Sequence, residues 1–203
     1  MYVPTHFKQD DTRALLGIIR EYGFGLLILA DEQGIEANHV PFHLLESDDS
    51  LGLLQCHLAR GNPAWQRLGE GAKVMVVFQG PDAYVSPSWY PSKAEHGRVV
   101  PTWNYLAVHA EGTARVVDNG AWLGQHLRAL ARQHEAGREQ PWAVDDAPPD
   151  YFDKLIRGIV GIEIQLQRLT GKLKASQNQP EPNRAGVMAG LAAEGQDAMA
   201  RLI

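Results

Sequence analysis

Short apolar runs separated by turn-forming segments constrain the fold of this chain most strongly. From Phe24 onward, these runs alternate with segments rich in Asp, Ser and Gly, such as Asp31–Gly34 and Gly69–Gly71. Brief runs bounded in this way are typical of antiparallel strands joined by tight turns. The pattern predicts strands near residues 24–30, 35–45, 51–58 and 73–79.

Two later segments also have strand character. Residues 159–169 show the clearest alternation, in which Ile162 and Ile164 are flanked by polar neighbours. Residues 99–117 alternate too, which predicts one long strand or a bent pair, with a bulge at Gly112. The aromatic, Pro-rich and Ser-rich segment 83–101 predicts a strand followed by an exposed loop.

Helical patterns occupy the segments around these strands. Asp10 and Asp11 are suited to cap a helix that runs to about Tyr22, and Gly23 would end it. Further helices are expected at about 63–68, 120–136 and 151–158, and a terminal helix from about Ala185.

About six antiparallel strands with few helices between them exclude a parallel nucleotide-binding sheet, and no G-x-G-x-x-G or P-loop motif occurs. We therefore expect a mainly β (α+β) fold, with an antiparallel sheet closed into a small or partly split β-barrel and with peripheral helices. Residues 1–203 are expected to form a single domain with a helical C-terminal extension over about 185–203. Such barrels bind ligands at a mouth or at a subunit interface.

The charge and cysteine content exclude several classes of protein. The chain has 19 basic and 24 acidic residues, and a net charge of −5 argues against a surface that is basic throughout. Cys56 is the only cysteine, so no internal disulfide or cysteine-based zinc site can form, which fits the reducing cytoplasm. The longest apolar run, residues 24–30, is far shorter than the roughly 20 residues of a membrane span. We expect a cytoplasmic protein with no membrane segment and no secretory signal.

A first group of residues suited to bind a ligand lies at Cys56–Pro63. There a predicted strand ends at Arg60 and continues into a helix capped by Asn62. Backbone N–H groups at a helix start, together with a guanidinium, form a plausible phosphate site. The alternative is that Arg60 forms a surface ion pair and Asn62 only caps the helix.

A second group combines the aromatic and hydroxyl-rich segments 79–90 and 100–105. Trp and Tyr would provide flat apolar walls, and Ser, Thr and Asn would bond the edge of a planar heterocycle. Alternatively, these aromatic side chains fill the core or an interface.

A third group is the polar segment 171–179, which follows the last alternating strand. If the strand continues, Lys172 and Lys174 share one face and supply charge to a bound phosphate or to a partner chain. The alternative is a solvated strand end.

The histidines predict no metal site. His39 and His43 would lie about 13 Å apart on one face of a strand, too far for one ion. The sequence has no H-E-x-x-H motif and no G-x-S-x-G motif, so a hydrolase is not favoured.

Taken in order, these segments closely resemble the PaiB-like family of FMN-binding negative transcriptional regulators. The resemblance covers nearly the whole chain, through the segments Met1–Phe7, His57–Pro63, Gly80–Tyr90, Val100–Tyr105 and Gly171–Lys172. It departs at Ala175, where a leucine is expected.

The resemblance implies a split β-barrel similar to that of pyridoxamine-phosphate oxidases and flavin reductases, in a homodimer that binds FMN between its subunits. It implies that Arg60 and Asn62 hold the FMN phosphate, with His57 nearby. By the same resemblance, the flavin ring and the rest of the pocket are contacted by His39, Pro41, Ser86, Trp89, Thr102, Trp103, Asn104, Tyr105, Lys172, Gln177 and Asn178.

The resemblance also implies a role in the negative regulation of transcription. The chain shows no basic helix-turn-helix, and its isoelectric point is near 5.9, so the residues give little support for direct DNA binding. The regulatory role is therefore expected to be indirect. A flavin-dependent oxidoreductase acting on a small molecule remains the alternative, with no catalytic residue assigned.

Overall fold

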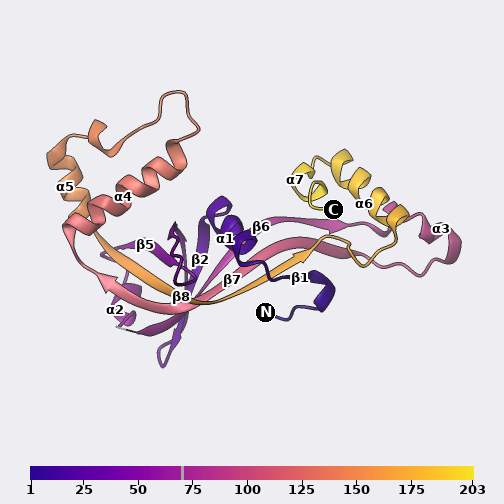
Figure 1. Cartoon of the computed structure of the whole chain (residues 1–203), viewed down its shortest axis with the longest axis horizontal. Helices are drawn as coiled ribbons and strands as arrows, with labels where there is room; N and C mark the ends of the chain where they lie inside the picture. The colour runs from indigo at the N-terminus through magenta and orange to yellow at the C-terminus, as the bar shows by residue number, and fades with distance from the viewer. Residues whose placement is uncertain (70) are drawn as a thin grey trace. The chain divides into compact units, whose positions relative to one another are not determined.

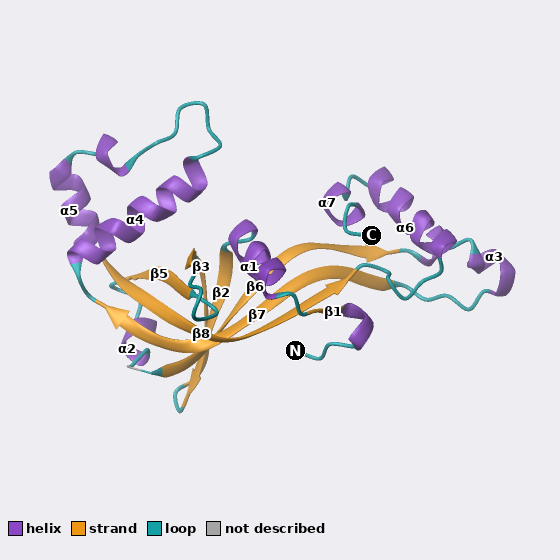
Figure 2. Ribbon diagram, in the orientation of Figure 1, coloured by secondary structure: helices purple, strands orange, loops and turns teal. Residues whose placement is uncertain are grey.

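The computed structural model describes residues 1–69 and 71–203, and strands are its dominant element (Figures 1 and 2). Glu70, within the turn predicted at Gly69–Gly71, lies outside the described residues. The strands are β1 (Lys8–Gln9), β2 (Phe24–Asp31), β3 (Gly34–Pro41), β4 (His43–Leu45), β5 (Leu53–Ala59), β6 (Ala72–Val85), β7 (Thr102–Val117) and β8 (Ile159–Lys174). The α-helices are α1 (Thr12–Glu21), α2 (Ala64–Arg67), α3 (Ser92–His96), α4 (Gly120–Glu135), α5 (Pro149–Arg157), α6 (Glu181–Ala193) and α7 (Asp197–Ala200). Three short 3-10 helices are η1 (Thr5–Phe7), η2 (Pro87–Trp89) and η3 (Val144–Asp146).

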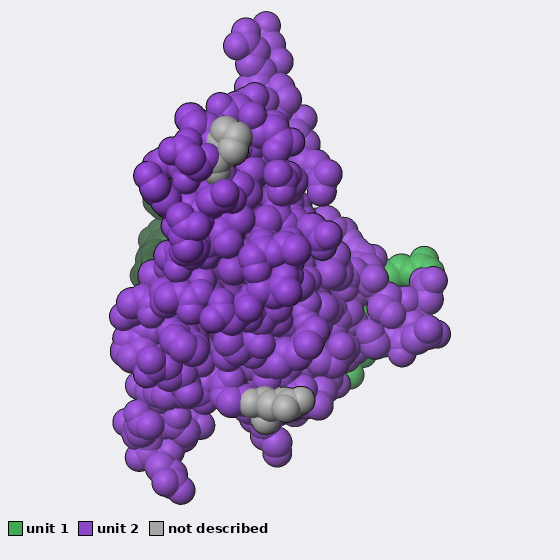
Figure 3. All heavy atoms as spheres, turned by 90° about the vertical axis from the view of Figure 1, so that its left-hand side faces the viewer, with its two compact units in different colours: residues 1–15, 79–108, 170–203 green, residues 16–78, 109–169 purple. Residues whose placement is uncertain are grey.

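The chain divides into two compact units (Figure 3). Unit 1 contains Met1–Leu15, Gln79–Val108 and Thr170–Ile203, and unit 2 contains Leu16–Phe78 and His109–Leu169. The long strands β6, β7 and β8 each pass from one unit into the other. The single domain expected over 1–203 stays a prediction.

The sheet closes on itself within unit 2. The strands follow one another in the order β3-β2-β6-β7-β8-β5-β4, and β1 pairs with β8 in addition. The pairs β2·β3, β2·β6, β4·β5 and β5·β8 are antiparallel. Although β3 and β4 are at opposite ends of this order, only Phe42 separates them in the sequence. One residue spans only about 3.5 Å, so the two ends of the sheet must meet and form a barrel.

The alternating apolar residues predicted for the strands form the core of unit 2. Leu27 on β2 and both Ile162 and Ile164 on β8 are fully buried. Phe42 packs edge-on against Phe78, with ring centroids 5.4 Å apart. This burial supplies the main favourable free energy of the barrel.

Unit 1 has its own apolar core, built around α6 and α7 (Figure 1). Val85, Val187 and Leu191 are completely buried there. Trp89 lies so close to Gly186 and Gly190 of α6 that neither position has room for a Cβ atom. Small residues on α6 therefore allow the helix to approach η2 closely.

The predicted strand over 35–45 is wrong in one respect, because it is two strands separated at Phe42. The backbone N–H of Phe42 donates to the carbonyl of Gly23 (2.8 Å). β3 pairs with β2 and β4 pairs with β5, so the chain changes partners at this residue.

Several element ends differ from the predicted ones. β6 continues to Val85 and β8 to Lys174, beyond the predicted ends at 79 and 169, because both strands extend into unit 1. The segment 83–101 contains η2 and α3 rather than only a loop, and β7 begins at Thr102 rather than at 99.

The helix ends differ as well. The helix expected over 63–68 covers only Ala64–Arg67. The terminal helix begins at Glu181 rather than near 185, since Pro182 is accommodated in its first turn, where a missing N–H has no cost. α7 is a separate helix after Gly195.

Gly112 lies within the continuous strand β7 rather than at a break. A Cβ atom there would collide with the carbonyl oxygen of Gln165 on β8. The glycine therefore allows two strands to approach closely. Among the helices that the structure describes, none has both the length and the apolar character of a membrane span.

Candidate functional site

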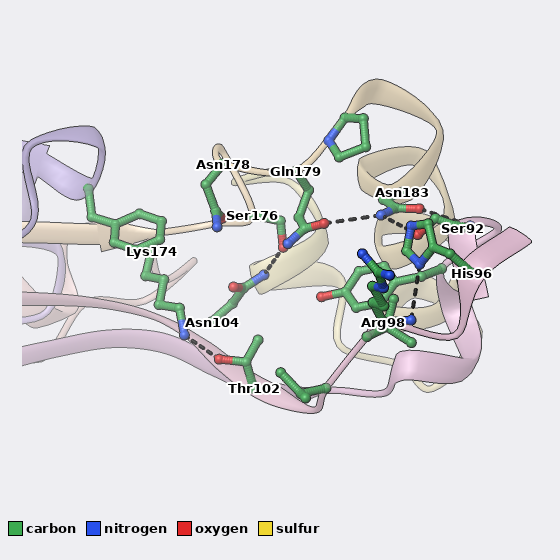
Figure 4. A pocket seen from close by; sticks show the side chains of 15 residues that line it. Ser92, His96, Arg98, Thr102, Asn104, Lys174, Ser176, Asn178, Gln179 and Asn183 are labelled. Atoms are coloured by element: carbon green, nitrogen blue, oxygen red, sulfur yellow. Dashed lines mark hydrogen bonds between the residues drawn. The ribbon is translucent and has the colours of Figure 1, made fainter.

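Unit 1 contains a cavity of about 440 Å³, shown in Figure 4. This volume lies within the range of about 300–1,000 Å³ that is usual for small-molecule sites. The lining combines apolar and aromatic walls with many polar groups from β7, β8, α3 and α6. The lining residues are Phe7, Tyr90, Ser92, His96, Arg98, Val99, Val100, Thr102, Asn104, Lys174, Ser176, Asn178, Gln179, Pro180 and Asn183.

Asn104 and Ser176 form a buried polar pair in the wall of this cavity (Figure 4). Asn104 is fully buried, and its Nδ2 donates to Ser176 Oγ (2.9 Å). Its Oδ1 is also buried and has no partner among the described residues. A buried amide oxygen without a hydrogen bond costs about 1–3 kcal/mol, so a ligand donor at this point would be stabilising.

Ser176 has a backbone conformation that non-glycine residues rarely adopt. Its φ of 61° is the only positive value outside glycine in the described part of the chain. Such strain costs on the order of 1–3 kcal/mol and is concentrated at functional sites. Ser176 lies in the short segment Ala175–Asn178, just after the end of β8 at Lys174.

Lys172 and Lys174 place two positive charges on this end of β8. Lys174 Nζ donates to Thr102 Oγ1 and lies 6.0 Å from the centroid of the Phe7 ring. Lys172 is buried, donates to the carbonyl of Tyr2 (3.2 Å) and lies 5.1 Å from the Tyr105 ring. Within residues 1–69 and 71–203, neither ammonium forms an ion pair with a carboxylate. Burial lowers the pKa of Lys174.

The opposite end of the cavity is held by a hydrogen-bonded group around Asn183 (Figure 4). Asn183 Nδ2 donates to Ser92 Oγ (2.9 Å) and to Gln179 Oε1 (3.0 Å), and this joins α6 to α3. The backbone N–H of Arg98 donates to His96 Nδ1 (3.0 Å). This end of the cavity is therefore polar, and hydrogen bonds hold its side chains together.

Of the site residues suggested by the sequence, the cavity brings together Thr102, Asn104 and Asn178. Lys172 lies beside it on β8, two residues before Lys174. Gln177 is exposed and bonds its own segment, through the backbone N–H of Ala175 and the carbonyl of Leu173.

The remaining suggested residues of unit 1 are engaged elsewhere. Ser86 caps η2 and accepts from the Ser88 N–H (3.2 Å). Trp89 packs on α6, and the ring of Tyr105 lies beneath Lys172. Trp103 is 55% exposed and makes an edge contact with Tyr84.

In unit 2, each nitrogen of the Arg60 guanidinium donates to a protein group. Its Nη1 and Nη2 donate to the Asp118 carboxylate (3.0 and 2.6 Å), and Nε donates to the Arg157 carbonyl (2.9 Å). Asn62 Oδ1 accepts from the Ala64 N–H (2.9 Å), and its Nδ2 donates to Asn38 (2.7 Å). These contacts match the alternative of an ion pair and a cap.

Three further suggested residues also belong to unit 2. His39 stacks on Phe24, with centroids 6.1 Å apart, and Pro41 is the register partner of Phe24 at the end of β3. His57 Nδ1 lies 3.1 Å from His126 Nε2. The neighbouring thiol of Cys56 is fully buried, which raises its pKa and leaves it unreactive.

Sequence reasoning missed a buried polar network around Glu163 and His126 in unit 2. Glu163 Oε1 accepts from Gln55 Nε2 (2.9 Å) and Trp122 Nε1 (2.8 Å), and its Oε2 accepts from Arg115 Nε (2.8 Å). The Trp122 ring stacks on His126 at 5.1 Å. Periodicity places Glu163 on the polar face of β8, so only the contacts of the folded protein show its burial.

Sequence reasoning also missed Ser92 and Asn183 in unit 1. Their side chains are 91 positions apart and meet only through the packing of α6 on α3. No local motif marks either residue.

Comparison with known proteins identifies the family. Residues 1–168 match the family described as "Putative FMN-binding domain". The chain belongs to this family. The match ends before Lys174, Ser176 and Asn178, so the lysine side of the cavity lies beyond it.

The match to a relative from Bacillus subtilis covers more of the chain than the family match does. The "Protease synthase and sporulation protein PAI 2" is 32% identical over 188 residues, which cover 93% of this chain and 87% of that protein. The resemblance to the PaiB-like family is thus confirmed.

Solved structures support the fold of this family member. A FAD and heme binding protein from Mycobacterium smegmatis has a TM-score of 0.59 at 17% identity, over 82% of this chain and 73% of that one. A conserved hypothetical protein from Mycobacterium tuberculosis has a TM-score of 0.59 at 11% identity, over 89% and 95%. The predicted mainly β fold, with an antiparallel sheet closed into a barrel and peripheral helices, is confirmed.

The buried imidazole of His126 makes the stability of the protein dependent on pH. Burial, helped by the charges of His57 and His43, lowers the pKa of His126 to about 3. In the unfolded chain, the histidine takes up a proton below about pH 6.5, whereas in the folded chain it does not, so the free energy of unfolding falls as the pH falls from 6.5 towards 3. The slope from this residue approaches roughly 1.4 kcal/mol per pH unit.

His126→Gln is expected to remove the contribution of His126 to the pH dependence of the free energy of unfolding. Urea unfolding of both proteins at pH 7, 6 and 5 measures it. His134→Gln, an exposed histidine on the same helix, is the matched control and should keep the wild-type slope. Equal slopes for wild type and His126→Gln would contradict the assignment.

Proposed function

We propose that unit 1 binds FMN in the cavity next to Lys174 and Asn104. Membership of the FMN-binding-domain family supports FMN as the ligand. The observation that carries the placement is the pair of lysines on β8: Lys172 is buried, Lys174 is half-buried, and neither forms an ion pair with a carboxylate of the described residues. An anionic ligand would supply the missing negative charge.

The charge of the cavity fits a phosphate ester. Burying an ammonium without a counter-charge costs several kcal/mol, and a phosphate brings negative charge and strong acceptor oxygens. Lys174 lines the cavity, Lys172 adds positive potential from the same strand, and the exposed Arg98 lies at the rim. We place the phosphate with these cations, because the Arg60 donors are already engaged with Asp118 and with backbone carbonyls.

The polar and apolar walls fit the other parts of FMN. Asn178 and Gln179 offer amides to the hydroxyls of a ribityl chain. The unpaired Oδ1 of Asn104 is an acceptor for an N–H donor, which the flavin ring possesses. Tyr90 and Phe7 provide apolar surface for an aromatic system.

When bound, FMN supplies one-electron and two-electron redox chemistry, and the chain supplies binding and orientation. Lys174, held by Thr102, keeps a positive charge at a fixed place in the cavity. Asn104, held by Ser176, presents its carbonyl oxygen in a fixed direction. Both groups are positioned before a ligand arrives, which lowers the entropy lost on binding.

Lys174→Gln is expected to weaken FMN binding by about 1.5–3 kcal/mol, the range for a hydrogen bond to a charged group. Quenching of FMN fluorescence on titration with protein measures the dissociation constant. Lys73→Gln, which removes the same charge from an exposed position in unit 2, is the matched control and should bind as wild type does. Unchanged affinity in Lys174→Gln would remove Lys174 from the site.

We propose further that the protein is a homodimer, as the family resemblance implies. Trp103 (55% exposed) and Tyr84 (46% exposed) form an aromatic contact on strands of unit 1. Trp103 lies between Thr102 and Asn104, which line the cavity, so a second subunit that covers Trp103 would adjoin the proposed FMN site. Aromatic residues of this kind are common at the centre of interfaces.

Trp103→Ser is expected to weaken the dimer by about 2 kcal/mol, the scale of an interface hot spot. Light scattering across a dilution series gives the mass of each form. Trp142→Ser, a control of similar exposure in unit 2, should leave the mass unchanged. A wild-type protein that has the mass of one chain at every concentration would refute the dimer.

We propose that the regulatory role of this family member is indirect. The net charge is −5, and a protein that binds DNA through its own surface usually presents a basic one. The control of transcription would then pass through a partner protein or through the redox state of the flavin. A mobility-shift titration on promoter DNA is expected to show no complex, and a complex that weakens steeply with salt would contradict the proposal.

A further inference from the structure

A second cavity lies in unit 2 and shares no lining residue with the cavity in unit 1. Its volume is about 350 Å³. It lies between α4 and the strands β4 and β5, and its lining is formed by His43, Leu45, Gln55, Trp122, Gln125, His126, Ala129 and Arg132. The α4 residues recur at intervals of three and four positions, so they share one face of the helix.

The orientation of His43 in this cavity is set by two hydrogen bonds. Gln133 Nε2 donates to the Phe42 carbonyl (3.4 Å), which directs Gln133 Oε1 towards His43. That oxygen can only accept, so His43 Nδ1 carries the hydrogen and donates to it (2.9 Å). In the neutral ring, His43 Nε2 is then an acceptor, and in the protonated ring it is a second donor.

His126 contributes a buried nitrogen that lacks a partner. The residue is 1% exposed, and its Nε2 pairs with His57. Its Nδ1 is buried and makes no hydrogen bond with a described residue. Stacking on Trp122 fixes the ring plane, so this nitrogen has a defined direction. A buried ring nitrogen left unpaired is costly, so His126 is an unsatisfied polar residue in the wall of this cavity.

The charge around the cavity favours an anion. Arg132 is exposed and forms no ion pair within the described part of the chain. Among the described residues, no Asp or Glu lines the cavity, and the carboxylate of the buried Glu163 accepts hydrogen bonds from Gln55, Trp122 and Arg115. An adjoining cavity of about 380 Å³ shares His43, Ala129 and Arg132 and adds Arg20, which pairs with Glu46.

We infer that this cavity binds a small organic acid. Its carboxylate would pair with the guanidinium of Arg132, which offers the planar fork that carboxylates fit. A polar group elsewhere on the acid would bond His43 Nε2. The apolar part would lie against Trp122, Leu45 and Ala129.

Histidine-ring NMR on the full chain tests this inference. The protein is labelled with ¹⁵N in its histidines, FMN is present in excess so that the cavity in unit 1 is filled, and sodium benzoate is the probe. The chemical shifts of the His126 and His43 ring signals are expected to change as benzoate is added and to reach a plateau when the site is full. Arg132→Gln should weaken the binding at least about tenfold, the lower end for loss of a charged hydrogen bond. Arg132 is exposed, and its side chain forms no hydrogen bond or ion pair with a described residue, so the variant should fold as wild type does.

Arg13→Gln is the matched control, because Arg13 is an exposed helical arginine in unit 1 and forms no ion pair among residues 1–69 and 71–203. It should bind benzoate as wild type does. Chemical-shift changes that reach no plateau would overturn the site. So would a titration curve for Arg132→Gln that equals the wild-type curve. Sodium phosphate is the second probe, and phosphate binding as tight as benzoate would overturn the assignment to an organic acid. Each of these outcomes can be read whether or not FMN binds in unit 1, so the test does not depend on the proposed FMN site.

Discussion

Lys172 and Lys174 bring two positive charges into unit 1 at a point where the described residues provide no carboxylate. A buried ammonium that lacks a counter-charge loses several kcal/mol of hydration. The Tyr105 ring, the Tyr2 carbonyl and the Thr102 hydroxyl compensate only part of this loss, because each is a dipole or a quadrupole rather than a charge. An anionic ligand in the cavity beside Lys174, as we propose, would supply the counter-charge.

The buried charge in unit 2 has the opposite character. Glu163 receives hydrogen bonds from Gln55, Trp122 and Arg115, and these hold the pKa of its carboxyl below the ordinary value in spite of burial. Arg60 is likewise matched by Asp118. In contrast, Asn104 in unit 1 and His126 in unit 2 each have a buried side-chain atom without a partner among the described residues, and both residues line cavities.

Much of the fold could be predicted from local patterns. The alternation of Ile162, Ile164 and Leu166 and the helical spacing in 120–136 are properties of single segments, and the structure confirms both elements. The ends of β6 and β8 could not be predicted in this way. Gly80, Pro81 and Gly171 are turn-forming types, and they remain in strands because the neighbouring strands of unit 1 hold them there.

The candidate site was only partly predictable for a related reason. Thr102, Asn104, Asn178 and the lysine pair belong to segments whose composition already suggested a ligand. The positive φ of Ser176 and the bond between Asn183 and Ser92 depend on contacts between distant segments, which composition does not encode. The same holds for Arg60, since its partner Asp118 is 58 positions away.

A crystal structure of the protein saturated with FMN tests the placement of the cofactor most directly. With the cation pair of β8 as the anchor, the phosphate of FMN should lie within hydrogen-bonding distance of Lys174 Nζ, and a donor group of the flavin should face Asn104 Oδ1. A phosphate bound at Arg60 with Asp118 displaced, or a cavity in unit 1 that remains free of FMN, would contradict it.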